Sequence, residues 1–158
     1  MLEKNYKIRN LPHSSYYQNL LLELYSGSEG FVINYLQFIY QYNLFFNKNK
    51  TYEDAFKFLI DNEFECISLV SEILSVLGCD TKFASSHGKF ISGKQIDYVK
   101  DLMQMLLLDI ENIEKNIIEI KSIKQKISIN AIKNQLRDIL IIKQTELMFL
   151  KNLVVEIK

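Results

Sequence analysis

The sequence predicts an all-α protein, a four-helix bundle with a long crossover between its second and third helices. Pro12 is the only proline and the five glycines fall in a few places, so long stretches of the chain carry no helix breaker. Within these stretches apolar residues recur at every third or fourth position, which is the period of one helix face. One connection, residues 79–93, is too long for a tight antiparallel turn and suits a crossover along the bundle.

The first helix is expected to span residues 14–46, with serine caps at its start and an interruption at residues 27–30, where two of the glycines lie. The second helix is expected to begin at Thr51, which together with Asp54 resembles a capping box, and to run to Leu77 before a glycine.

The third helix is expected to run from Lys94 to Lys124, because Ser92 and Gln95 supply another capping box just before its apolar pattern begins. A short polar turn follows near Ser128. The fourth helix then extends to the end of the sequence. These four helices and the crossover account for nearly the whole chain.

Length and charge limit the classes of function. The chain has 158 residues, 48% of them apolar, which is enough for one domain spanning residues 1–158 with a core of its own. Residues 1–13 are expected to form an N-terminal extension of this domain. The 19 basic residues equal the 19 acidic ones, so no overall charge favours nucleic acid or an acidic membrane as a partner.

The sequence also predicts a compartment. No apolar run reaches the length of a membrane span, and the N-terminal residues lack the apolar segment of a signal peptide. If Cys66 and Cys79 lie on one helix, they are separated by about 20 Å along its axis, too far for a disulfide. The abundance of Ile, Lys and Asn is typical of an AT-rich bacterial genome. We therefore expect a cytoplasmic bacterial protein.

The inward faces of the four helices follow from the helical period. In the first helix the face is aromatic and consists of Phe31, Tyr35, Phe38, Tyr42 and Phe45. In the second it consists of Phe56, Leu59, Glu63, Cys66, Val70, Ile73 and Leu77. In the third it has no polar member and consists of Val99, Leu102, Leu106, Ile110, Ile113, Ile117 and Ile120. In the fourth it consists of Ile132, Leu136, Ile139, Lys143, Glu146, Leu150, Val154 and Ile157.

Four polar residues, Glu63, Cys66, Lys143 and Glu146, are therefore predicted to face the core. An unpaired buried charge costs several kcal/mol, so we expect the Lys143 ammonium to lie within hydrogen-bond reach of Glu63 or Glu146. Two simpler interpretations stay open: Glu146 turns to solvent, and Cys66 is only a small buried apolar residue.

Three segments, "LYSGSEGFVINYLQFIYQ", "LGCDTKFASSHGKFISG" and "MLLLDIENIEK", resemble the small ferritin-like proteins related to rubrerythrin, manganese catalase and a spore-coat component. The resemblance extends from about residue 19 to the end of the chain. It implies an up-down-down-up bundle, in which glutamates of the first and third helices and one ExxH motif on each of the others hold two iron or manganese ions. In that family these ions carry the redox chemistry.

Matched position by position, the resemblance leaves one of the six metal ligands in place, Glu63. The substituted ligand positions are Phe31, Cys66, Ile113, Lys143 and Glu146. Glu29 precedes the first ligand position by two residues and is expected to point elsewhere around the helix. Neither histidine, His13 nor His87, belongs to an ExxH motif, and both are expected in exposed loops.

We therefore expect a ferritin-like protein that has lost its dinuclear metal site and acts as a non-catalytic structural or interaction module without a cofactor. Its expected partner is a second copy of the chain or a ferritin-like relative. The alternative is an altered metalloprotein or oxidoreductase, in which Glu63, Cys66 and Glu146 bind a single zinc or iron ion after Lys143 swings aside. A small apolar ligand between the helices is a third alternative.

Overall fold

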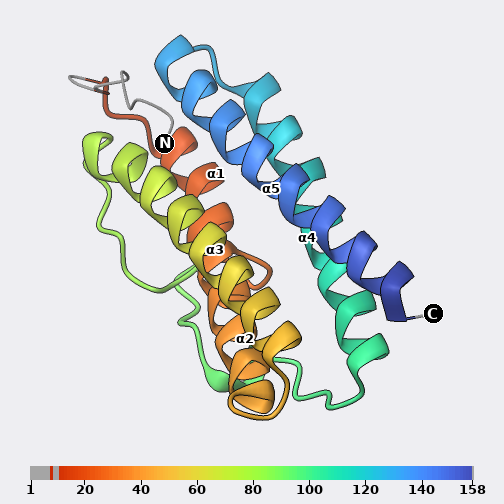
Figure 1. Cartoon of the computed structure of the whole chain (residues 1–158). Helices are drawn as coiled ribbons and strands as arrows, with labels where there is room; N and C mark the ends of the chain where they lie inside the picture. Colours follow the sequence, from red (N-terminus) through yellow and green to blue (C-terminus); the bar gives the residue numbers. More distant parts are fainter. Residues whose placement is uncertain (1–7, 9–10, 158) are drawn as a thin grey trace.

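A computed structural model describes residues 8 and 11–157 of the chain (Figure 1). The described residues form α1 (Ser15–Ser26), α2 (Phe31–Phe45), α3 (Lys50–Val76), η1 (Gly93–Gln95), α4 (Leu102–Lys126) and α5 (Asn130–Ile157). α1 and α2 run in one direction, α3 returns, and the crossover leads to the antiparallel pair of α4 and α5. The predicted ferritin-like bundle with up-down-down-up order is confirmed. Most of the predicted N-terminal extension lies outside the described residues.

α1 and α2 together form the first helix of the bundle, and the predicted interruption at residues 27–30 separates them. A Cβ atom on Gly27 would lie 2.5 Å from the backbone oxygen of Glu23. The chain therefore passes too close to the end of α1 to carry a larger side chain there. Ser14 caps α1 as predicted, since its hydroxyl accepts from the N–H of Tyr17 at 3.2 Å.

The predicted cap of α3 was wrong. The side chain of Asn49, not of Thr51, caps this helix by accepting from the N–H of Tyr52 at 3.2 Å. Asp54 instead forms an ion pair with Lys50 at 2.8 Å. Asn ranks above Thr as an N-cap residue, and its position places Thr51 inside the first turn of the helix.

The crossover is longer than the predicted 79–93, and spans residues 77–101, because the third bundle helix begins later than predicted. Ser92 and Gln95 do form the predicted capping box, but it starts only the short 3-10 helix η1. α4 begins after Asp101, whose carboxylate accepts from a backbone N–H of the first turn at 2.9 Å. The predicted start at residue 94 was therefore wrong.

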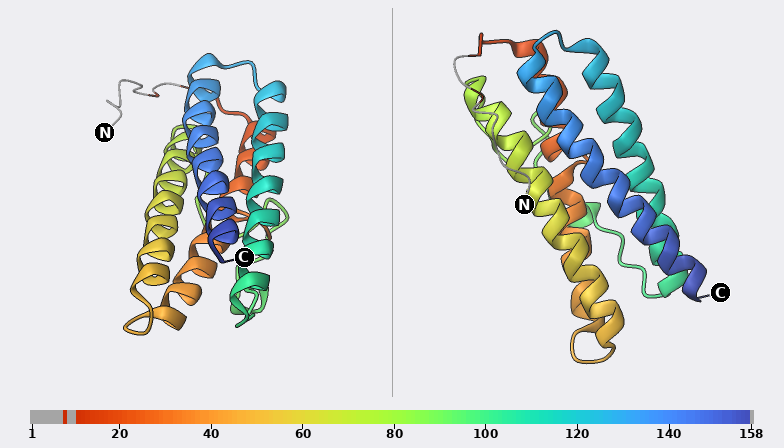
Figure 2. Two further views of the ribbon diagram at one scale, coloured as in Figure 1. Left: turned by 45° about the vertical axis from the view of Figure 1, so that its right-hand side comes forward. Right: turned by 45° about the horizontal axis from the view of Figure 1, so that its top comes forward.

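The crossover is fastened to the first bundle helix by hydrogen bonds. The Gln37 side chain donates to the backbone oxygen of Asp97 at 2.8 Å and accepts from its N–H at 2.8 Å. The Ser26 hydroxyl donates to the backbone oxygen of Ala84, which forms an isolated antiparallel bridge with Phe90. Figures 1 and 2 show the crossover running along the bundle from the end of α3 to the start of α4.

The core consists of two apolar clusters, one toward each end of the bundle. Along α3, Leu59 belongs to one cluster and Cys66 to the other. Along α5, Leu150 belongs to the cluster of Leu59 and Ile139 to the cluster of Cys66. Glu63, which lies between Leu59 and Cys66 in the sequence, therefore marks a boundary between the clusters at the middle of the bundle.

The predicted inward face of the second bundle helix is buried along its whole length, from Phe56 to Leu77. The prediction of a third face without polar members was wrong, because Asp109 and Asn116 of α4 are buried, and Val99 lies in the crossover. On the predicted faces of the first and fourth bundle helices, the members that are only half-buried are Tyr35, Tyr42, Phe45 and Ile157.

None of the helices in the described residues combines the length and the apolarity needed to cross a membrane.

Candidate functional site at the centre of the bundle

The four polar residues predicted to face the core lie at the boundary between the two apolar clusters. Glu63 and Cys66 come from α3, Lys143 and Glu146 come from α5, and all four have no exposed surface. On each helix the two residues are about one turn apart, so their side chains share a face. α3 and α5 thus enclose one charged group within the core.

Lys143 is at the centre of this group. Its Nζ donates to Oε1 of Glu63 and lies 3.7 Å from Oε1 of Glu146. The ammonium also lies 4.6 Å from the centroid of the Phe31 ring on α2, which is a favourable cation–π distance. The prediction that the ammonium lies within hydrogen-bond reach of a carboxylate is confirmed.

The charge of Lys143 is stabilised by its neighbours. Burial alone would lower the pKa of Lys143, because a low dielectric disfavours the ammonium. The Coulombic attraction of Glu146 and of Glu63 outweighs burial, and the pKa of Lys143 is raised above its ordinary value. The core therefore holds a permanent, covalently attached cation.

Glu146 behaves differently from its partners. Burial raises the pKa of Glu146 well above its ordinary value, the neighbouring Glu63 carboxylate raises it further, and Lys143 opposes both. Neither oxygen of Glu146 has a hydrogen-bond partner among the described residues, and Oε2 of Glu63 has none either. A proton on Glu146 would allow it to donate to Oε2 of Glu63. The group contains one ammonium and two carboxyl groups. If Glu146 carries a proton, the positive charge of Lys143 and the negative charge of Glu63 cancel.

Cys66 belongs to the apolar part of the site. Burial raises the pKa of its thiol well above the ordinary value, and the attraction of Lys143 only partly opposes this effect. The thiol therefore keeps its proton and packs as a small apolar side chain in the cluster that contains Ile73 and Ile139. Cys66 and Cys79 are both free cysteines.

The other substituted ligand positions contribute no charge. Phe31 is fully buried and provides the ring beneath Lys143, while Ile113 is fully buried in the cluster that contains Leu59. Glu29 lies outside the core, where its half-exposed carboxylate pairs with Lys115 at 3.2 Å.

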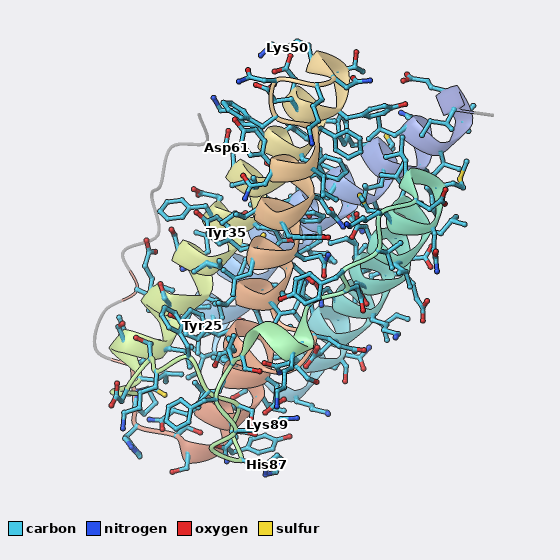
Figure 3. The ribbon with its side chains drawn as sticks, turned by 90° about the horizontal axis from the view of Figure 1, so that it is seen from below. Tyr25, Tyr35, Lys50, Asp61, His87 and Lys89 are labelled. Carbon is cyan, nitrogen blue, oxygen red and sulfur yellow. The ribbon has the colours of Figure 1, made fainter. Side chains whose placement is uncertain are left out.

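The histidines are distant from this group. Both His13 and His87 are exposed. Figure 3 places His87 and Lys89 on the crossover at one edge of the molecule. Within residues 8 and 11–157, no three or more His, Cys, Asp or Glu side chains are grouped so that they could hold a metal ion.

A second set of buried polar residues joins α2 to α4, and the sequence analysis missed it. The Gln41 amide donates to Oδ1 of Asp109 at 2.9 Å, and the Asn34 amide donates to Oδ1 of Asn116 at 2.6 Å. Helical spacing was the signal that could have found them. Asp109 and Asn116 lie four residues before and three residues after Ile113, on the same face of α4.

A surface groove of about 560 Å³ lies between α1 and α4. Its lining combines apolar residues such as Leu20 and Ile118 with the carboxylates of Glu23 and Glu119. None of the residues of the central charged group lines it. The groove and the core are therefore separate features of the molecule.

The fold is shared with a solved metalloprotein. Two crystal structures of KatB, a manganese catalase from Anabaena, align with this chain at a TM-score of 0.81 and 15% sequence identity. The alignment covers 99% of this chain and 80% of KatB. No protein-family model matches the chain, and no curated protein matches its sequence. At this identity the likeness shows the fold, and the activity has to be argued from the side chains.

Proposed function

We propose that this chain is a ferritin-like protein in which a buried lysine replaces the dinuclear metal site, so that the bundle acts as a non-catalytic structural or interaction module. The observation that carries the proposal is the Lys143 ammonium, which is fully buried between Glu63 and Glu146. The resemblance in sequence assigns this part of the bundle to the metal ions. The cation that balances the buried carboxylates is then part of the chain itself.

The residues at the expected ligand positions do not suit two divalent ions. Iron and manganese in such bundles are held by carboxylates and imidazoles. Here a fixed ammonium occupies the space between the carboxylates, and it would repel any second cation brought close to it. Phe31 and Ile113 are fully buried and offer no ligand atom. The donor set therefore argues against chemistry that depends on a pair of metal ions.

Activity assays test the proposal. Protein produced with added manganese and iron is expected to show neither catalase nor ferroxidase activity beside a manganese catalase as the positive control. A matched variant restores the ligand set through Phe31→Glu, Cys66→His, Ile113→Glu, Lys143→Glu and Glu146→His. This variant is expected to bind two ions per chain, as the family does. Turnover by the unmodified protein comparable with that of the control would contradict the proposal.

A second candidate function is that of a single-ion metalloprotein or oxidoreductase. It is favoured by three buried carboxyl oxygens without a hydrogen-bond partner, namely Oε2 of Glu63 and both oxygens of Glu146. Together with the thiol of Cys66 these groups offer three ligands to one zinc or iron ion if Lys143 moves aside. Calorimetric titration with Zn²⁺ distinguishes the two candidates. Tight binding of one ion that Cys66→Ala abolishes would support the metalloprotein.

We also propose a second copy of the chain or a ferritin-like relative as the partner of the module. The outer face of α5 supports this, because Ile141, Met148 and Val155 are exposed there and recur about every two turns. Light scattering at several concentrations is expected to give a dimer mass for the chain alone. Met148→Lys should then yield monomers, whereas Asn43→Lys, at an exposed position of α2 away from this face, should leave the mass unchanged.

A further inference from the structure

Gln41 of α2 and Asp109 of α4 form a buried pair in which two atoms have no partner. The Gln41 amide donates to Oδ1 of Asp109 at 2.9 Å, and the two residues are only 2% and 3% exposed. The other oxygens, Oε1 of Gln41 and Oδ2 of Asp109, have no hydrogen-bond partner among the described residues. Buried polar atoms without partners are rare, so this pair calls for a chemical explanation.

A single proton would account for both atoms. A carboxamide oxygen and an ionised carboxylate are acceptors only, so the two partnerless oxygens cannot bond to each other while Asp109 is ionised. A proton on Oδ2 turns that oxygen into a donor for Oε1 of Gln41. The acid and the amide then share two hydrogen bonds in one ring, and every polar atom of the pair has a partner.

We propose that Asp109 is a carboxylic acid in mildly acidic solution and that its proton acts as a latch between two helical hairpins, one formed by α1, α2 and α3 and the other by α4 and α5. The ligand of this site is the proton. The latch is separate from the charged group around Lys143, and it stands whether or not the proposed function is correct.

The surroundings of Asp109 favour the neutral acid. Burial raises its pKa, Asp97 and Glu63 raise it further, and the hydrogen bond from Gln41 opposes them, which brings the pKa to about 7. Asp97 acts from the crossover and Glu63 acts from α3. The buried cation of α5, Lys143, is bound to Glu63. The charged groups that act on Asp109 are therefore carboxyl groups.

The direction of the pH dependence follows from the raised pKa of Asp109. In the unfolded chain the residue has its ordinary pKa of 3.8, so between about pH 4 and pH 7 only the folded state binds the proton. Raising the pH through this window weakens the fold. The unfolding equilibrium constant rises about tenfold per pH unit from this residue alone. Above about pH 7 both states are ionised, this contribution is constant, and the latch is open.

The latch lies where the two hairpins meet. The Asn34–Asn116 hydrogen bond joins the same two helices about two turns away. Gln37, one turn from Gln41, holds the backbone of Asp97 in the crossover. Ionisation of Asp109 would place an unpaired charge beside Gln41, one turn of α2 from the Gln37 contact and two turns from the Asn34 contact. Opening the latch is therefore expected to loosen α2 from α4 and to free this part of the crossover.

The variant Asp109→Asn tests the latch, because its amide supplies permanently the two hydrogen bonds that the protonated acid makes. Urea unfolding is measured from about pH 5 to about pH 9 for the wild type and the variant. The ratio of their unfolding constants is expected to rise about tenfold per pH unit up to about pH 7 and then to level, with the variant the more stable protein in alkali. Asp97→Asn is a matched control at an exposed carboxylate. Its unfolding constant should depend on pH as that of the wild type does, but should level at a slightly lower pH, because Asp97 helps to raise the pKa of Asp109.

Infrared spectroscopy of the folded wild type keeps the latch testable if Asp109→Asn does not fold. Labelling with ¹³C-aspartate separates the carboxyl bands of aspartates from those of glutamates such as Glu146. A protonated aspartate band that disappears as the pH rises through about 7 is expected. Labelled wild-type protein without such a band at about pH 6 would overturn the proposal, as would a ratio of unfolding constants that does not change with pH.

Discussion

The bundle buries carboxyl groups in two places and balances them in two ways. Between α3 and α5, the Lys143 ammonium is bound to Glu63, and burial together with the Glu63 carboxylate raises the pKa of Glu146 well above its ordinary value. Between α2 and α4, the Asp109 side chain accepts a hydrogen bond from the amide of Gln41, and within the described part of the chain no ion pair with a cation involves it. In the first place, which we call the charged layer, the cation is the side chain of Lys143. Its raised pKa keeps the ammonium protonated throughout the neutral pH range. In the second place, the α2–α4 layer of Gln41, Asp109, Asn34 and Asn116, the Asp109 carboxylate is neutralised by a proton, so its charge changes with pH. The charged layer and the α2–α4 layer therefore differ in how their stability depends on pH.

The charged layer should show the largest effect of a single substitution. Lys143→Met removes the cation and leaves Glu63 and Glu146 without a partner, so the free energy of unfolding is expected to fall by about 3–5 kcal/mol. Urea unfolding at neutral pH measures this loss. Lys151→Met is the matched control on the same helix, because Lys151 is half-exposed and pairs with Glu114 only at the surface.

Replacing the whole charged group distinguishes pairing from burial. A variant that combines Glu63→Leu, Lys143→Met and Glu146→Leu leaves no charge in this layer, and its stability is expected to lie close to that of the wild type. Equal losses from the single and the triple substitution would show that packing, and not charge balance, determines the effect of Lys143. The comparison between the two layers would then lose its basis.

An intermediate loss of stability is expected from a substitution in the α2–α4 layer. Asn116 accepts from Asn34 at 2.6 Å and donates to the backbone oxygen of Glu29 at 2.8 Å. Asn116→Ala leaves both groups without their partner, so a loss of about 1–3 kcal/mol is expected from the free energy of unfolding. A loss as large as that of Lys143→Met would mean that charge does not set the two layers apart. Thermal and urea unfolding at matched pH give this comparison.

The smallest effect is expected at Glu146. The pKa of Glu146 is raised well above its ordinary value, and the protonated side chain that this shift favours resembles a neutral amide in shape and charge. Glu146→Gln is therefore expected to change the free energy of unfolding by less than about 1 kcal/mol at neutral pH. Glu63→Gln, its matched counterpart, removes the acceptor of the Lys143 hydrogen bond and should be clearly more destabilising. The reverse order would mean that the proton resides on Glu63.

The sequence predicted the fold and the charged layer because both depend on strong periodic signals. Glu63 and Lys143 interrupt otherwise apolar faces, and a buried lysine requires a carboxylate nearby. Asp109 and Asn116 were missed because the third face was traced only through its apolar residues, although both share the face of Ile113. Buried polar residues should therefore be sought at every inward position of each helix, including helices whose inward face is otherwise apolar.

Local signals of helix starts were less reliable than the faces. Thr51 fits a capping pattern, yet Asn49 provides the cap because it precedes the helix and competes better for the free N–H groups. Ser92 and Gln95 form a true capping box, but the chain leaves the helical conformation after η1 and starts α4 only at Leu102. A capping motif marks a turn of helix without fixing the length of the helix that follows.

The central claim is that the Lys143 ammonium takes the place of metal ions among the carboxyl groups of the bundle. Elemental analysis of the unmodified protein, purified from cells supplied with manganese and iron and never exposed to chelators, tests it most directly. The account predicts no stoichiometric iron or manganese in the folded protein, and the same result after prolonged incubation with either metal. Two ions per chain, released only when the bundle unfolds, would contradict the account, because no arrangement with a buried ammonium beside Glu63 and Glu146 leaves room for them.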